Sequence, residues 1–117
     1  MTYYLQNPDI EQDYELANQY FQQACEGGDS KGCTGMAKLY LTGSGVEQNL
    51  ELAGQYFQQG CDEGDPEGCT TLGRLYLRGV GVEQSYDLAR QYFQQACDDD
   101  YLVGCNDLAE LEGSDPF

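Results

Sequence analysis

Six cysteines form three pairs with one fixed spacing, and they are the residues of this chain most regularly placed for chemistry. The pairs, each eight residues apart, are Cys25 and Cys33, Cys61 and Cys69, and Cys97 and Cys105. Paired cysteines form disulfides, bind zinc or pack as reduced core residues. The chain has no histidine and lacks the usual Cys-x-x-Cys spacing, so zinc is the weakest of these interpretations. Disulfides are favoured, with reduced core cysteines as the alternative.

Other arrangements that could support catalysis or ligand binding are weak. A chain without histidine offers neither a Ser-His nor a Cys-His pair to activate a nucleophile. A Ser-x-x-Lys motif is also absent, because no serine has a lysine three positions later. The Gly-x-Gly segments at 43–45 and 79–81 follow predicted helices instead of strands, which indicates helix-ending turns rather than a phosphate-binding loop. The sequence therefore predicts no catalytic residue, no metal site and no cofactor.

The cysteines lie in a phrase that recurs along the chain every 36 residues. Its best-matched part reads LANQYFQQAC at 16–25, LAGQYFQQGC at 52–61 and LARQYFQQAC at 88–97, with eight of ten positions identical. The match continues through LYLTGSGVEQ at 39–48 and LYLRGVGVEQ at 75–84, and YYLQNPDIEQ at 3–12 falls in the same register. Repeats of this length are typical of solenoid proteins, in which each copy packs on its neighbours.

Within one copy the apolar residues recur at helical spacing. One stripe consists of Leu52, Ala53, Tyr56, Phe57 and Cys61. Helices are predicted near 13–25, 30–42, 49–61, 66–78, 85–97 and 101–112. Gly43 and Gly79 follow a last apolar turn, where a left-handed residue ends a helix. We therefore expect one all-α domain over residues 1–117, an α/α solenoid of antiparallel helix pairs. The pairs are predicted at about 13–42, 49–78 and 85–112, with a partial helix at the N-terminus.

Each cysteine pair links the end of one predicted helix to the first turn of the next. A short turn between antiparallel helices brings these ends together, within the roughly 4.4 to 6.8 Å between Cα atoms that a disulfide allows. Each bridge would close a loop of about eight residues and stabilise the fold by roughly 2.5 kcal/mol on the loop-entropy account. In a chain of 117 residues, whose core is modest, three such bridges would be a large share of the total stability.

The repeated pattern resembles the Sel1-like repeat, a relative of the tetratricopeptide repeat. The motifs that carry the resemblance are the alanine and aromatic pair, Ala-Cys, Gly-Cys, Leu-Gly-x-Leu-Tyr and Gly-x-Gly-Val, from residue 3 to about 111. Because it has cysteines where most of the family has alanines, the chain resembles the Helicobacter cysteine-rich protein branch. The resemblance implies a disulfide-bridged solenoid that acts as a non-catalytic scaffold or adaptor for a protein segment, including inhibitor or immunity proteins. It implies β-lactam binding or weak β-lactamase-like activity as an alternative, for which the Ser-x-x-Lys motif is lacking.

The chain is strongly acidic, with 21 acidic and 5 basic residues and a formal net charge of -16. This field repels nucleic acid and anionic lipid headgroups and favours a basic protein partner. No apolar run approaches the roughly 18 residues that a membrane span needs, and the first residues lack a secretory signal. Oxidised cysteines would indicate a periplasmic or secreted protein whose signal is not part of this chain, and reduced cysteines a cytoplasmic one.

A solenoid of helix pairs presents a concave face that is lined by one helix of each repeat. On the helices predicted at 30–42, 66–78 and 101–112, some positions differ between copies while the packing positions are kept. We expect these variable residues to contact a partner: Thr34, Lys38, Thr70, Thr71, Arg74, Arg78, Asn106 and Glu110. The three cations among them would grip an acidic side chain or a chain terminus, or only reduce self-repulsion. Poorly covered apolar faces at both ends of the array would allow self-association.

Overall fold

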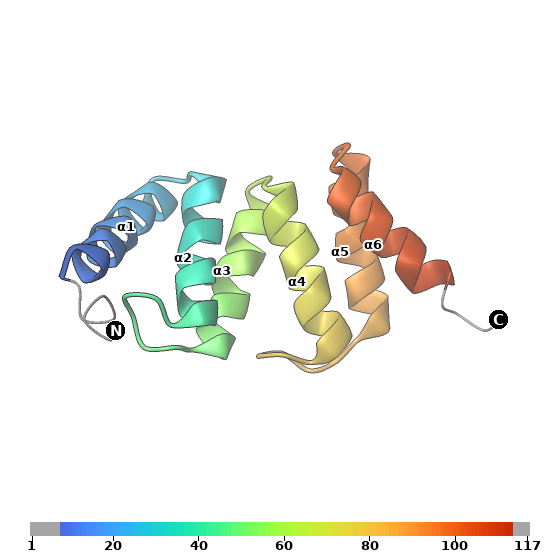
Figure 1. Cartoon of the computed structure of the whole chain (residues 1–117). Helices are drawn as coiled ribbons and strands as arrows, with labels where there is room; N and C mark the ends of the chain where they lie inside the picture. Colours follow the sequence, from blue (N-terminus) through green and yellow to red (C-terminus); the bar gives the residue numbers. More distant parts are fainter. Residues whose placement is uncertain (1–7, 114–117) are drawn as a thin grey trace.

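The computed structural model of the protein describes residues 8–113, and their side chains from residue 13 onward. Over these residues the chain forms six helices and no strand: α1 (Pro8–Glu26), α2 (Ser30–Thr42), α3 (Leu50–Asp62), α4 (Pro66–Arg78), α5 (Tyr86–Asp98) and α6 (Leu102–Gly113). Successive helices lie antiparallel and side by side, and the stack advances along one direction (Figure 1). The predicted all-α solenoid is confirmed.

The helix ends are fixed by local hydrogen bonds. The side chains that cap helix N-termini by accepting a backbone N–H are those of Asp29, Asn49, Asp65 and Ser85. Pro66 occupies the start of α4, where its missing N–H leaves no hydrogen bond unmade. Gly43 and Gly79 end α2 and α4 with φ of 73° and 69°, and their N–H groups bond to carbonyls of the preceding turn. Only glycine adopts this left-handed conformation without strain, so the predicted caps are confirmed.

The core follows the apolar stripes seen in the repeats. Phe57 and Phe93 are fully buried, and each packs in its own cluster, with Ala53 and Ala89 respectively beside it. Half-buried tyrosines cover these clusters as stacked pairs, Tyr40 on Tyr56 and Tyr76 on Tyr92, with 5.8 Å between ring centroids in each pair. The tyrosines and phenylalanines of these two copies therefore act in packing, as large apolar residues at helical spacing do.

Three disulfides join the helices in pairs. They connect Cys25 to Cys33, Cys61 to Cys69, and Cys97 to Cys105, with Cα atoms 4.5 Å apart in each. Each bridge links the end of one helix to the first turn of the next, as the spacing predicted. The central pair is fully buried, so its sulfur atoms also fill space in the core.

The start of α1 differs from the prediction. Residues 3–12 were expected to share the register of 39–48, whose last residues form a turn, yet the helix begins at Pro8. In the turns of the other copies, Gly43 and Gly45 both have φ of 73°. The corresponding residues here are Asn7 and Asp9. Because glycine is absent from both positions, the turn is not formed and the segment from Pro8 onward is helical. The partial helix expected at the N-terminus lies largely outside the described residues.

Two residues at the ends of the stack are less buried than their repeat position predicts. Tyr20 is 65% exposed, whereas its counterparts Tyr56 and Tyr92 are stacked on tyrosines of the preceding helix. Ala109 is exposed, although Ala37 and Gly73 at the same position are buried. Gly73 lies against Phe93 of the following helix, and among the described residues no helix follows α6 to cover Ala109.

Candidate interaction surface

Helices α2, α4 and α6 form one layer of the stack. Besides packing on its neighbours in sequence, α4 contacts both α2 and α6. Helices on the inner side of a curved stack approach one another more closely than those on the outer side, so α2, α4 and α6 line the inner surface. All eight residues expected to contact a partner lie on these three helices.

Two of the expected residues are not on the surface. Thr34 and Thr70 are each 2% exposed, and their hydroxyl groups face neighbouring helices. A Cβ atom added to Gly60 would lie 2.5 Å from the Thr34 Oγ1 atom, and one added to Gly104 would lie 3.1 Å from that of Thr70. The prediction that these threonines contact a partner is therefore wrong, because their side chains are buried between packed helices.

Two of the expected cations connect neighbouring inner helices. Lys38 on α2 pairs with Glu67 on α4. Arg74, at the equivalent position on α4, pairs with Asp107 on α6, with 2.6 Å between Nε and Oδ2. The hydrogen bond to Asp107 is the largest cause that raises the pKa of Arg74. Exposed ion pairs of this kind contribute about 0 to 1 kcal/mol each, so they align the helices more than they stabilise them.

The remaining expected residues are available to solvent to different degrees. Arg78, Asn106 and Glu110 are exposed, and Thr71 is half-buried. The side chain of Arg78 forms no ion pair or hydrogen bond with the described residues, in contrast to the paired Lys38. This side chain is therefore free to bind an anionic group.

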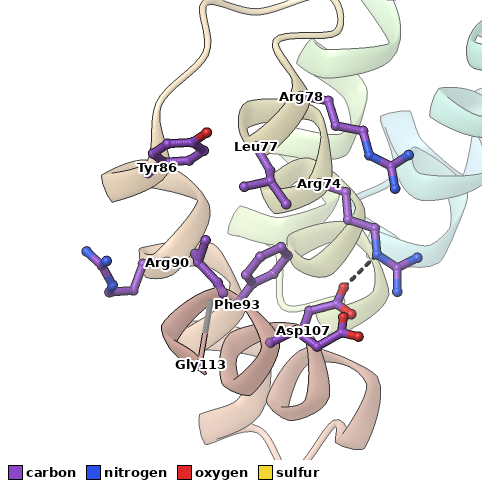
Figure 2. Close-up of a pocket in the computed structure, with 10 residues that line it drawn as sticks. Arg74, Leu77, Arg78, Tyr86, Arg90, Phe93, Asp107 and Gly113 are labelled. Carbon is purple, nitrogen blue, oxygen red and sulfur yellow. Dashed lines mark hydrogen bonds and ion pairs between the residues drawn. The ribbon is translucent and has the colours of Figure 1, made fainter. Parts of the chain in front are cut away.

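All three arginines of the chain line a groove between α4, α5 and α6. It encloses about 950 Å³ and is lined by Arg74, Leu77, Arg78, Tyr86, Arg90, Phe93, Asp107, Glu110, Leu111 and Gly113. Figure 2 shows Leu77 and Phe93 in the middle of this site, with Arg74 and Arg78 on one side and Tyr86 and Arg90 on the other, where the Arg90 side chain points away from the middle. The groove thus combines apolar side chains with a rim that carries charges of both signs.

Sequence reasoning missed Tyr86 and Arg90, because the search for binding residues was confined to the inner helices. Both belong to α5, which is not one of the inner helices. A signal was present, however. Arg90 corresponds to Asn18 and Gly54 in the other copies, and it is the only cation at this position of the repeat.

A smaller groove of about 320 Å³ lies between α1, α2 and α4 on the inner surface. Lys31, Lys38, Asp65 and Glu67 supply its charged lining. Because Lys38 and Glu67 pair with each other across this groove, its charges are largely matched.

The described part of the chain is poor in groups for metal binding or nucleophilic chemistry. No group of three or more His, Cys, Asp or Glu side chains there could hold a metal ion. All six cysteines are in disulfides, so none is free in this structure. None of the described helices has both the length and the apolar character required to cross a bilayer.

Comparison with known proteins places this geometry in context. The chain matches the Sel1 repeat family over residues 2–29, 30–65 and 66–101. No curated protein sequence matches it significantly.

Solved structures with a similar fold include cysteine-rich protein B of Helicobacter pylori, which is 32% identical to this chain. That comparison has a TM-score of 0.73 and covers 75% of this chain and 66% of the other. A Sel1 repeat protein from Oxalobacter formigenes is 23% identical with a TM-score of 0.77, over 81% of this chain and 39% of that one. A protective antigen of uropathogenic Escherichia coli strains is also 23% identical, with a TM-score of 0.74, over 79% of this chain and 20% of its own. The chain thus spans less than two thirds of each of these proteins.

Proposed function

Because this chain belongs to the Sel1 repeat family, we propose that it is a non-catalytic scaffold that binds a protein partner on the inner surface of α2, α4 and α6. Proteins with Sel1 repeats are generally protein-interaction scaffolds. The observation that carries the proposal is the exposure of Arg78, Asn106 and Glu110, which vary between copies whose packing residues are kept.

The charge of the chain supports a basic partner. A net charge of -16 attracts positively charged proteins over distances of about one Debye length and increases their association rate. An inhibitor or immunity role against a basic protein is the special case that this field fits. The alternative of β-lactam binding rests on the family resemblance alone, and nitrocefin hydrolysis by the purified protein is the measurement that would support it.

The disulfides support an extracytoplasmic location. Bridges of this kind persist in the periplasm and outside the cell and are rare in the reducing cytosol. Cysteine-rich protein B, the similar structure at 32% identity, is named for the same residue type. The mass of protein purified with its free thiols alkylated, before and after reduction, tests this part of the proposal. Six alkylated thiols before reduction would contradict it.

The binding proposal is tested by affinity capture with the disulfide-intact protein, followed by calorimetry with the captured partner. The variant N106A/E110A alters two exposed residues of the inner helix α6, and Q91A/Q95A alters two exposed residues of α5 as a matched control. We expect at least a tenfold loss of affinity from the first variant and less than a twofold change from the second. Equal effects of both variants would contradict the assignment to the inner surface.

A further inference from the structure

We propose that the smaller groove, between α1, α2 and α4, binds the ammonium group of a lysine side chain from the partner at the buried carboxylate of Asp65. This inference rests on the proposed function, because it assigns one group of a basic partner to one site on the inner surface. The groove encloses about 320 Å³, which is enough for a single lysine side chain. Besides its charged residues, the lining includes Phe21, Thr34, Gly35 and Leu39.

Asp65 carries a buried carboxylate that is used at only one of its two oxygens. The residue is 3% exposed, and its Oδ1 atom accepts the backbone N–H of Glu67 at 3.2 Å, which caps α4. Its Oδ2 atom is buried and has no hydrogen-bond partner within the described residues. A buried charge without a partner is unfavourable for folding, and proteins keep such groups mainly at functional sites.

Capping alone does not explain a charged residue at this position. Asn49 and Ser85 cap α3 and α5 through one side-chain oxygen, and neither carries a charge. The equivalents of Asp65 in the other copies are Asp29, which is exposed, and Tyr101, which brings no carboxylate. Among the described residues, Asp65 is therefore the one buried carboxylate, and it lies where α4 faces α2.

A second unpartnered atom belongs to the lining of the same groove. Thr34 is 2% exposed, and its Oγ1 atom has no hydrogen-bond partner among the described residues. Helices α3 and α4 enclose it, since a Cβ atom added to Gly60 or Gly68 would lie 2.5 or 2.9 Å from this oxygen. The two unpartnered atoms thus lie among α2, α3 and α4, in the part of the stack that has described helices on both sides.

The other charges of the groove leave the carboxylate of Asp65 unmatched. Two lysines and two acidic residues line the groove, so its net charge is zero. Lys38 and Glu67 pair with each other, and their side chains are 50% and 41% exposed. Lys31 is exposed, and its ammonium group forms no ion pair within the described residues. Because an exposed ion pair is weak, these long side chains can move aside for a cation that approaches Asp65.

The number of free acceptors favours an ammonium group over a guanidinium group. A guanidinium binds a carboxylate best with two parallel hydrogen bonds, one to each oxygen. One oxygen of Asp65 already accepts the N–H of Glu67, so a bidentate contact would compete with the cap of α4. An ammonium group has three donors in a compact head and needs only single oxygens as acceptors. The methylene groups of the lysine would pack on the apolar lining that Phe21 and Leu39 supply.

The test is an NMR titration of the isotope-labelled, disulfide-intact chain with Nα-acetyl-lysine amide at physiological salt. The norleucine analogue, which lacks the ammonium group, and the arginine analogue, which carries a guanidinium group, are titrated in the same way. We expect saturable shifts of the backbone signals of Gly35 and Glu67 with the lysine compound. The norleucine analogue should bind at least about tenfold more weakly, because it cannot form a charge-assisted hydrogen bond. The arginine analogue should also bind more weakly than the lysine compound.

Two pairs of variants assign the binding to the buried atoms. Asp65→Asn removes the charge and keeps the cap, and Asp29→Asn makes the same change at an exposed capping residue outside the groove. We expect at least about a tenfold loss of affinity from the first and less than a twofold change from the second. Thr34→Val should weaken binding, whereas Thr70→Val, at an equally buried hydroxyl outside this groove, should not. Asp65→Asn should also raise the urea midpoint of the free chain, because it removes a buried unpaired charge.

Several results would overturn the inference. Equal effects of D65N and D29N on affinity would do so, because the lysine compound would then respond only to the net charge of the chain. Tighter binding of the arginine analogue, or shifts that leave out the groove residues, would also contradict it. A lower urea midpoint in Lys31→Ala, without binding of the lysine compound, would assign the carboxylate to Lys31 of the chain itself. The proposed function would survive each of these results if a captured partner still lost affinity with N106A/E110A.

Discussion

At the scale of single residues, the glycine before each second cysteine sets the distance between the bridged helices. These glycines are Gly32, Gly68 and Gly104. A Cβ atom on them would lie 2.7, 3.2 and 3.3 Å, respectively, from the backbone nitrogen of the first cysteine of the pair. A larger residue would push the helices apart from this close approach, in which the Cα separation of 4.5 Å in each bridge is near the short end of the range that a disulfide allows. The Gly-Cys motif therefore permits the close approach of the two helices at the bridge.

The first prediction concerns this contact. We expect Gly32→Ala to lower the free energy of unfolding by about 1 to 3 kcal/mol, because the new methyl group meets the Ala24 Cβ atom at 2.5 Å and the backbone of Cys25. Gly113→Ala is the control, since a Cβ atom there has no neighbour within 4 Å. Urea unfolding of both oxidised variants gives the comparison. Equal stability of the two would show that α1 and α2 separate freely.

Residue types at fixed spacing predicted the bridges but not the whole surface. The pairing of the cysteines could be predicted because their spacing of eight residues is that of two antiparallel helix ends around a short turn. Thr34 and Thr70 were misplaced because variation between copies does not distinguish a residue that faces solvent from one that faces a neighbouring helix. Arg90 was missed because the groove is formed by three helices, and its partners at the site are distant in sequence.

At the scale of the helices, side chains of successive elements are coupled through tyrosines. Tyr92 on α5 stacks on Tyr76 of α4 and donates a hydrogen bond from its hydroxyl to Oε1 of Gln58 on α3, at 2.8 Å. One side chain thus holds three helices in register. Burial is the largest cause that raises the pKa of Tyr92.

The second prediction is a loss of stability in alkali. Because the folded state raises the pKa of Tyr92, it keeps this proton to higher pH than the unfolded chain does. The resulting stability is fully present below the unfolded pKa of about 10 and is lost as the pH rises through the folded pKa. Urea unfolding between pH 8 and 11 should therefore show a shallower alkaline decline for Tyr92→Phe than for the original chain. Tyr20→Phe, at an exposed phenol, should keep the original slope, and identical slopes for both variants would contradict the prediction.

Helix boundaries were largely predictable because their determinants are local. The glycine caps, Pro66 and the capping Asp, Asn and Ser residues act within a few positions of themselves, and α2 to α6 begin and end within one residue of the predicted ranges. The first helix was predicted too short, because the repeat register was carried over to a segment without its glycines. The packing of α4 on both α2 and α6 depends on contacts between distant residues, which the periodicity of one helix does not contain.

At the scale of the whole molecule, charge repulsion outweighs the ion pairs. The net charge of -16 is distributed over a chain of 117 residues, whereas the described residues form three ion pairs, all partly exposed. Such pairs contribute about 0 to 1 kcal/mol each. Repulsion among the acidic residues therefore dominates the electrostatic free energy of the compact state.

The third prediction follows from this balance. Raising sodium chloride from low to roughly 0.5 M should stabilise the oxidised protein by on the order of 1 kcal/mol, because screening reduces the repulsion more than it weakens the pairs. The urea midpoint measured at several salt concentrations provides the test. A fall in the midpoint with added salt would mean that the ion pairs between α2, α4 and α6 affect stability more than the repulsion does.

The placement of the bridges also bears on how such a protein can change in length during evolution. When the array is divided into the helix pairs α1–α2, α3–α4 and α5–α6, both cysteines of every disulfide lie within the same pair, although each bridge crosses the end of a matched family repeat, at residue 29, 65 or 101. Duplication of one copy in the gene would therefore add a complete bridge, and deletion of one would remove a complete bridge. Neither event leaves an unpaired thiol to misfold the product, so the covalent architecture permits arrays to lengthen or shorten by whole units.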